Sequence, residues 1–188
     1  MVRTLSVFGS EVIAGYTIAM RIVVFSLLPS WGLSNAASTL VGQNLGAEKP
    51  ERAARAIWIT SIANMIVLGI VGFFLIVFPD TFIKVFTSET KVIELGSVCL
   101  RMVSYGFVFY GLGMVMTQSI NGAGDTYTPT FINIFCFWLL EVPLAYLLAL
   151  HTGLHQNGVY IAIVIAESMV AILGLVIIKR GKWKLKKV

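Results

Sequence analysis

The main shortage in this 188-residue sequence is charge, because only 12% of its residues are Asp, Glu, Lys or Arg. A typical soluble domain has about 25% charged residues and about 45–50% apolar ones, whereas 57% of this chain is hydrophobic. A small globule keeps much of its surface in water and cannot hide so much apolar surface. The composition therefore excludes a disordered chain, a collagen, a coiled coil and a soluble enzyme. It indicates a protein that lies in a lipid bilayer.

Reactive side chains and catalytic motifs are also scarce. The two cysteines, Cys99 and Cys136, both lie inside apolar runs and are predicted to be inert buried thiols. The sequence has no G-x-S-x-G, H-E-x-x-H, P-loop or CxxC motif, so no enzyme and no cofactor are expected. His151 and His155 are four residues apart but lack a third ligand, so no metal site is predicted.

Long uncharged runs take the place of these motifs. About 20 apolar residues suffice for one helical span, and in lipid the backbone must satisfy its own hydrogen bonds. The expected fold class is therefore all-α, a polytopic membrane protein with five transmembrane helices. The expected helices cover residues 12–45, 52–78, 92–121, 128–150 and 158–178. The first is overlong and is expected to bend at Pro29 and Gly32, and a short interfacial helix is expected at 80–86.

The positions of Lys and Arg predict the orientation. Six of the 14 basic residues lie in the last ten positions, so the C-terminus is expected to be cytoplasmic. A tail of this kind predicts contact with lipid rather than with nucleic acid. Alternation of the five spans then places the N-terminus outside. We therefore expect another helix to precede Met1 in a longer chain, and a location in the inner (plasma) membrane.

Two acidic residues inside predicted spans are the main candidates for function. Glu141 and Glu167 each lie about 14 Å from the outer ends of their helices, so they could meet near the middle of the bilayer. A charge there is costly, and two adjacent acids disfavour simultaneous ionisation, which suits proton or cation exchange. The alternative is that each acid is neutral or is hydrogen-bonded as a structural contact.

Three further residues complete the candidate site. Tyr110 and Gln118 are eight residues apart on one predicted helix and share a face, which could line a polar cavity or simply pack in the core. Arg21 could reach the two acids and pair with one of them, or it could lie at the outer interface. Asp125 is expected to be a loop or capping carboxylate.

Two motifs and the tail resemble a known family. The string AASTLVGQNLGA at 36–47, followed by Lys49-Pro50-Glu51-Arg52-Ala53, resembles the second-helix signature of a half of a MATE (multidrug and toxic compound extrusion) protein. The string NGAGDT at 121–126, followed by Thr128-Pro129, is similar to the family's loop between the fourth and fifth helices, and RGKWK at 180–184 is similar to many bacterial C-termini. Residues 1–188 thus resemble the C-terminal bundle, from the end of helix 7 through helix 12.

The resemblance implies a cation-coupled efflux antiporter driven by Na⁺ or H⁺, which exports organic cations and drugs by alternating access between two lobes. It also implies a missing N-terminal lobe as a partner. In the family, coupling acids lie on helix 1, or on helices 7 and 10, but the tenth helix here has no acid between Arg101 and Asp125. That ion site is therefore not carried over. The alternatives are a related flippase for lipid-linked saccharides and a truncated fragment that only assembles with another half.

Overall fold

The computed structural model describes residues 1–185, and the last two lysines of the basic tail lie outside the described residues. Regular structure in the described part is helical throughout. The elements are α1 (Val2–Leu5), η1 (Ser6–Phe8), α2 (Ser10–Gly46), α3 (Pro50–Val77), α4 (Pro79–Lys84), α5 (Thr90–Ser104), α6 (Phe107–Gly122), α7 (Tyr127–Asn133), η2 (Ile134–Glu141), α8 (Val142–His151), α9 (Gln156–Arg180) and η3 (Lys182–Leu185).

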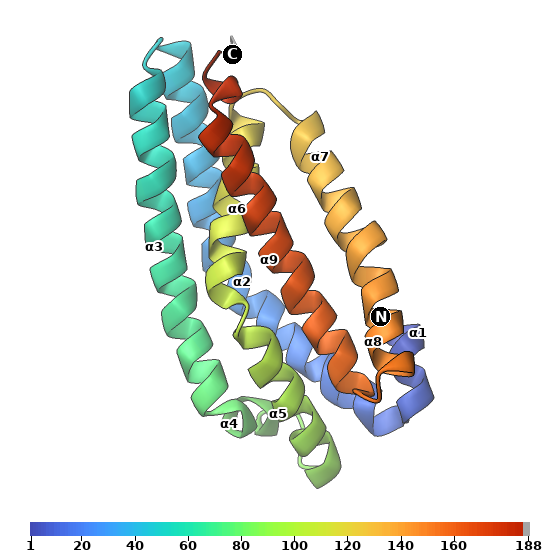
Figure 1. Ribbon diagram of the computed structural model, residues 1–188. Coiled ribbons are helices and arrows are strands. Elements are labelled where there is room, and N and C mark those ends of the chain that lie inside the picture. The colour runs from blue at the N-terminus through green and yellow to red at the C-terminus, as the bar shows by residue number, and fades with distance from the viewer. Residues whose placement is uncertain (186–188) are drawn as a thin grey trace.

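The long helical segments lie side by side and alternate in direction (Figure 1). α2 and α6 form the middle of the bundle, because α2 packs on α3, α5 and α6, and α6 also packs on α3 and α9. α9 extends the bundle by packing on α5 and α8 as well. The segment from α7 to α8 lies beside α9, on the opposite side of the bundle from α3 (Figure 1).

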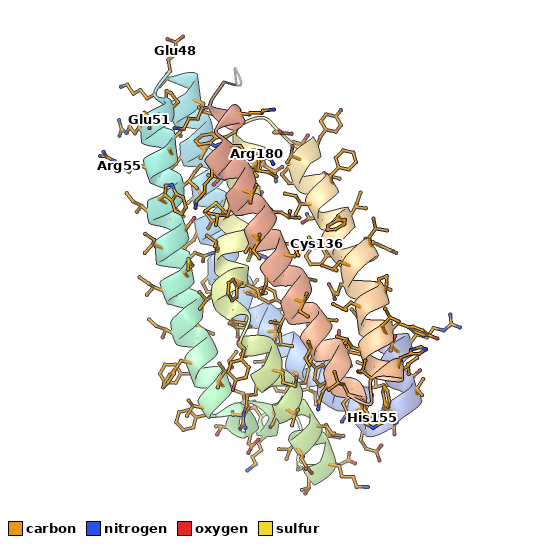
Figure 2. The ribbon with its side chains drawn as sticks, in the orientation of Figure 1. Glu48, Glu51, Arg55, Cys136, His155 and Arg180 are labelled. Atoms are coloured by element: carbon orange, nitrogen blue, oxygen red, sulfur yellow. The ribbon has the colours of Figure 1, made fainter. Side chains whose placement is uncertain are left out.

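The expected membrane spans are confirmed. α2, α3, the stretch Tyr127–His151 and α9 are long and apolar enough to cross a bilayer, and α5 with α6 makes a fifth span if the bent pair counts as one. Glu48, Glu51, Arg55 and Arg180 lie at the end of the bundle where the C-terminus lies, whereas His155 lies at the other end (Figure 2). The expected short helix between the second and third spans is α4.

α2 remains one helix of 37 residues although Pro29 lies inside it. A proline within a helix removes one backbone donor and crowds the preceding turn, which favours a change of direction. Figure 1 shows α2 running obliquely in its first half and more steeply in its second half. The predicted bend is thus absorbed without a break in the helix.

The predicted continuous helix at 92–121 is wrong in its middle. α5 ends at Ser104, α6 begins at Phe107, and the two axes differ by 52°. Two local features accompany the break. Ser104 Oγ donates to the carbonyl oxygen of Leu100 at 2.7 Å, a back-bond that bends helices, and Gly106 carries no side chain to stabilise a helical turn.

The predicted helix at 128–150 is one continuous span, but its middle is not α-helical. Residues Ile134–Glu141 form a π-helix, and Pro143 follows two residues later. Because Pro143 has no N–H group, the preceding carbonyls cannot all find α-helical donors, and a wider turn accommodates the mismatch. At the start of this span Asp125 is a capping carboxylate, as expected, since the Thr128 N–H donates to its Oδ1 at 3.2 Å.

α3 shows how the helices are oriented in the bilayer. Its outward side chains are large and apolar and recur at helical spacing, namely Ile59, Ile62, Ile66, Ile70 and Phe73. Its buried face instead includes the polar residues Thr60, Ser61 and Asn64. This polarity is the reverse of that of a helix on a water-soluble protein, where the apolar stripe faces the core. It is the arrangement expected when lipid is the solvent and polar groups hold the helices together.

Asn64 forms the main polar junction between helices. Its Nδ2 donates to Ser30 Oγ on α2 at 2.7 Å and to the Gly111 carbonyl on α6 at 2.9 Å. Asn64 and Ser30 are fully buried. Gly111 allows the close approach, because a Cβ added there would lie 3.0 Å from the Asn64 carbonyl oxygen. One amide therefore joins three helices near the middle of the bundle.

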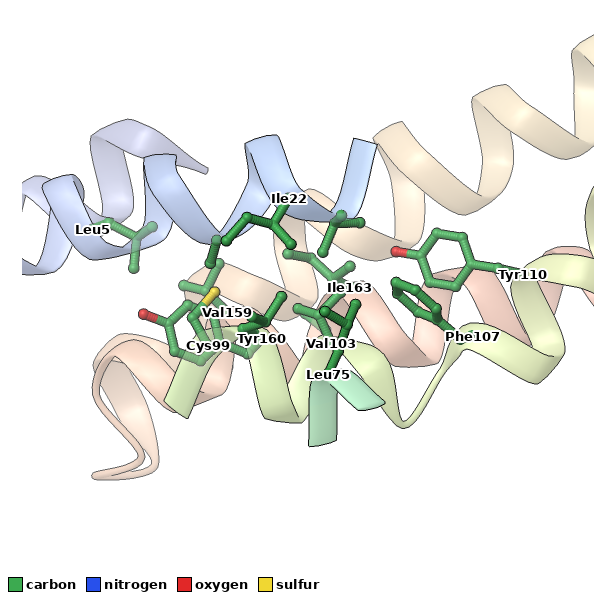
Figure 3. Packing of buried hydrophobic residues seen from close by; sticks show 14 of the residues in the cluster. Leu5, Ile22, Leu75, Cys99, Val103, Phe107, Tyr110, Val159, Tyr160 and Ile163 are labelled. Atoms are coloured by element: carbon green, nitrogen blue, oxygen red, sulfur yellow. The ribbon is translucent and has the colours of Figure 1, made fainter. Parts of the chain in front are cut away.

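Apolar packing surrounds this junction. Ile22 from α2, Val103 from α5 and Ile163 from α9 interleave in the largest buried cluster (Figure 3). At the C-terminal end, Trp183 is buried against residues of α2, α3 and α6, and its indole N–H donates to the Ile178 carbonyl at 2.9 Å. The only ion pair in residues 1–185 lies beside it and joins Lys184 to Glu51 at 2.8 Å. The tail thus fastens the end of α9 to α3.

Replacing Asn64 by Ala is expected to lower the free energy of unfolding by about 1–2 kcal/mol, because it removes two interhelical hydrogen bonds that are each worth a fraction of that amount in a membrane. Unfolding in mixed micelles, followed by circular dichroism, measures the change. The matched control is Ile62→Ala, which shortens a lipid-facing side chain on the same helix. An equal loss of stability in both variants would contradict the assigned role of Asn64.

Candidate functional site

A cavity of about 440 Å³ lies between α2, α6, α9 and the α7–η2 segment. We call it the Glu167 cavity. Its lining comprises Leu27, Trp31, Tyr110, Met114, Thr117, Gln118, Asn121, Pro129, Asn133, Phe137, Glu167 and Val170. Most ligand pockets are largely apolar with a few converging polar groups. This cavity has that character, and its one ionisable carboxylate is Glu167.

Glu167 lies well inside its membrane span. It is eleven residues after the first residue of α9, or about 16 Å along the axis. The side chain is half-buried, and no basic side chain in residues 1–185 forms an ion pair with it. An unpaired carboxylate in the middle of a span is costly in lipid when it is charged.

The opposite wall of the cavity comes from α6. Tyr110, Met114, Thr117, Gln118 and Asn121 are spaced at i, i+4, i+7, i+8 and i+11, which places them on one helical face. The predicted pair Tyr110 and Gln118 thus lines the same cavity as Glu167.

Hydrogen bonds orient the amides of this wall. Asn121 Nδ2 donates to Gln118 Oε1 at 2.9 Å, and Gln118 Nε2 points toward Asn35 Oδ1 of α2 at 3.4 Å. The Thr117 hydroxyl is occupied, since it donates to the Gly113 carbonyl at 2.8 Å. Gln118 is therefore held between two helices, which fixes where its amide faces the cavity.

The sequence interpretation missed three polar residues of this site. Thr117 and Asn121 continue the stripe that begins at Tyr110, so their helical spacing was a usable signal. Asn133 was harder to find, because it comes from the next span and the rotation of α7 about its axis is set by packing. The structure adds an amide to the wall that faces Glu167.

Glu141 has a different position. It is half-buried at the last residue of the π-helix and does not line the Glu167 cavity. The π-helix that carries it packs on α9, which carries Glu167. Of the two predicted acids, only Glu167 reaches the cavity wall.

Arg21 is not part of this arrangement. Its side chain is exposed and lines a separate, mainly apolar groove with Tyr16, Met20 and Phe86. In the part of the chain that the structure describes, neither Glu141 nor Glu167 forms an ion pair with it. Of the two interpretations of Arg21, the ion pair with one of the two acids is therefore absent from residues 1–185.

Comparison with known proteins identifies the family. The sequence profile described as MatE matches residues 1–147, which is well over half of the chain. The chain belongs to the MATE family. It is a family of transporters and not of enzymes, so the chain is a multi-pass membrane protein of a transport family. This agrees with the resemblance seen in its motifs.

Individual relatives support the same family assignment. The chain is 27% identical over 187 residues to a probable multidrug resistance protein NorM of Thermotoga maritima, covering 98% of this chain and 40% of that protein. It is 25% identical over 154 residues to a probable multidrug resistance protein YoeA of Bacillus subtilis, covering 82% of this chain and 33% of that one. The chain therefore spans about two fifths or less of the length of these relatives.

Solved structures confirm the fold. A MATE crystal structure in a straight conformation aligns with a TM-score of 0.90 at 25% identity, over 100% of this chain and 42% of that one. The eukaryotic MATE transporter AtDTX14 aligns with a TM-score of 0.87 at 22% identity, over 94% of this chain and 40% of that one. The helical bundle matches part of a MATE transporter in both cases.

If the Glu167 cavity holds water, a cysteine placed on its wall should react with a water-soluble thiol reagent. We expect Asn133→Cys to be labelled at least roughly tenfold faster than Phe135→Cys. The reason is that a thiol must ionise in water before it reacts. Phe135 serves as the control because it is an exposed apolar residue on the same span and does not line the cavity. Labelling of the protein in membranes measures both rates. The buried Cys99 and Cys136 supply the unreactive background. Equal rates for the two variants would show that the cavity is dry.

Proposed function

We propose that this chain forms the C-terminal membrane lobe of a cation-coupled multidrug efflux antiporter, and that the Glu167 cavity binds the coupling ion or the cationic substrate. The observation that carries the proposal is the unpaired Glu167 carboxylate on the wall of a polar cavity within a membrane span. Family membership and the multidrug resistance names of the relatives support the substrate class. Because the chain spans two fifths of their length, the activity belongs to the complete transporter.

The chemistry of the cavity suits competition between cations. A carboxylate at mid-span costs roughly 2.5–3.5 kcal/mol when charged, so a proton, a sodium ion or an organic cation that neutralises it gains binding energy. Amide, hydroxyl and carboxylate oxygens suit a hard metal cation. The rings of Trp31 and Tyr110 offer faces for an organic cation. Cations that share one carboxylate exclude each other, which is the requirement for antiport.

Glu141 fits as a second, indirect acid. The segment that carries it packs on α9, so a charge on Glu141 would repel a charge on Glu167. A position outside the cavity wall keeps Glu141 away from bulky substrates. We therefore assign to Glu167 direct binding of the transported cation, and to Glu141 an influence on how tightly Glu167 holds it.

Alternating access requires a second wall. The cavity is bounded by the helices of one bundle, and transporters of this kind rock two bundles about a shared central site. An N-terminal lobe that faces this bundle is therefore the partner we propose. The basic residues near the C-terminal end, together with Lys49, Arg52 and Arg55, support a cytoplasmic position for that end in the plasma membrane.

Replacing Glu167 by Gln should abolish cation-driven export. Gln keeps the size and hydrogen-bonding capacity of the side chain but cannot exchange a proton or balance a cation. The codon is changed in the native gene, so that the variant chain is tested together with its normal partners. Efflux of a cationic dye from everted vesicles, under imposed Na⁺ and H⁺ gradients, is expected to fall at least tenfold. Glu141→Gln should slow export less and shift its dependence on ion concentration.

The control for this experiment is Glu89→Gln, which removes an exposed acid at the start of α5, away from the cavity. Membrane abundance of each variant is measured by immunoblot, so that loss of folding is separated from loss of transport. Normal gradient-driven export by Glu167→Gln would disprove the site. Export of lipid-linked saccharide rather than dye would disprove the proposed substrate class.

A further inference from the structure

The groove between α4 and α5 is a second concave site, separate from the Glu167 cavity. It has a volume of about 640 Å³ and lies at the end of the bundle opposite the C-terminus (Figure 1). α4 contributes Asp80 and Lys84, and α5 contributes Glu94, Ser97 and Arg101. It shares no lining residue with the Glu167 cavity, so its role is independent of the proposed transport function.

The groove presents charges of both signs that do not neutralise each other. Its two carboxylates, Asp80 and Glu94, and its two bases, Lys84 and Arg101, form no ion pair within residues 1–185. Glu94 and Arg101 are seven residues apart on α5, or two helical turns, so they share a face at a distance too long for direct contact. A ligand that carries a cation and an anion a few atoms apart would satisfy both.

A buried hydroxyl at this site lacks a partner. Ser97 lies on the same face of α5, between Glu94 and Arg101, and is only 5% exposed. Its Oγ has no hydrogen-bond partner. A buried polar atom without a partner costs free energy, so a bound group that accepts a hydrogen bond here would remove that cost. The Oγ has almost no exposed surface, so a group bound in the groove would reach it through a rotation of the Ser97 side chain.

The surroundings of the groove indicate lipid. Phe78, Phe82, Val85 and Phe86, in and beside α4, are exposed apolar side chains. Their presence next to Asp80 and Lys84 is the pattern of a segment that lies in the membrane interface. Charged groups at that depth meet lipid headgroups, and the apolar side chains meet the upper part of the acyl chains.

We propose that the α4–α5 groove binds the headgroup of a phospholipid that carries both a phosphate and a primary ammonium, as phosphatidylethanolamine does. Arg101 and Lys84 would hold the phosphate, Glu94 and Asp80 would accept hydrogen bonds from the ammonium, and the Ser97 hydroxyl would donate to a phosphate oxygen. Phosphatidylcholine has no N–H group for the carboxylates, and phosphatidylglycerol has no cation. The site should therefore select against both.

Native mass spectrometry tests this proposal by measuring how tightly lipids bind to the purified, delipidated chain in detergent. We expect phosphatidylethanolamine to bind at least roughly tenfold more tightly than phosphatidylcholine or phosphatidylglycerol of the same acyl chains. Glu94→Gln and Arg101→Gln should each weaken that binding by about tenfold, because each removes a charge-assisted hydrogen bond. Ser97→Ala, which removes only the hydroxyl group, should weaken it several-fold.

The matched control is the double variant Glu89→Gln/Lys91→Gln, which removes one acid and one base at the start of α5 outside the groove. Its affinity for phosphatidylethanolamine should be unchanged. Equal affinity for the three lipids, or equal weakening by the control, would overturn the proposal. Soluble phosphoethanolamine should fail to displace the lipid at matched concentration, and displacement would assign the groove to a free zwitterion instead of a membrane lipid.

Discussion

The structure depends on one constraint, which is that lipid offers polar groups no hydrogen bonds and gives apolar helices no reason to associate. The helices are therefore held together by close contacts and by polar groups that face inward. Gly15 of α2 and Gly96 of α5 meet so closely that a Cβ at Gly15 would lie 2.7 Å from the Gly96 nitrogen. Asn64 supplies the polar counterpart by bonding to both α2 and α6. Large apolar side chains are left to face the lipid.

The same constraint explains why a cavity can exist beside α6. This helix packs closely on neighbours at two sides, because Gly111 contacts α3 and Gly113 contacts Ala171 of α9. The polar stripe from Tyr110 to Asn121 lies where neighbouring helices do not close completely. Polar side chains that have no helix to bind must bind each other, water or a ligand. One part of the surface of α6 thus packs on other helices, and another part lines the proposed binding site.

Sequence predicts the spans well because hydrophobic length and charge are properties of each segment alone. It predicts breaks poorly, because those depend on local competition for hydrogen bonds, as at Ser104 and before Pro143. The π-helix bears on the two acids as well. A π-helical segment turns less per residue than an α-helix, so the face on which Glu141 lies does not follow from α-helical spacing. Glu167 lies in regular α-helix and lines the cavity.

Charged residues are sparse in this protein, and the role of each depends on its depth in the membrane. Near the ends of the bundle, side chains such as Glu51 and Lys184 pair or meet water at little cost. In the headgroup region the four charged side chains of the α4–α5 groove form no ion pair within residues 1–185, and a complementary headgroup is the partner we propose for them. At mid-span neither water nor headgroups reach a carboxylate unless a cavity admits them. In the proposed function, Glu167 is tolerated there because its cavity admits a cation that neutralises it, and the exchange of one such cation for another is what an antiporter requires.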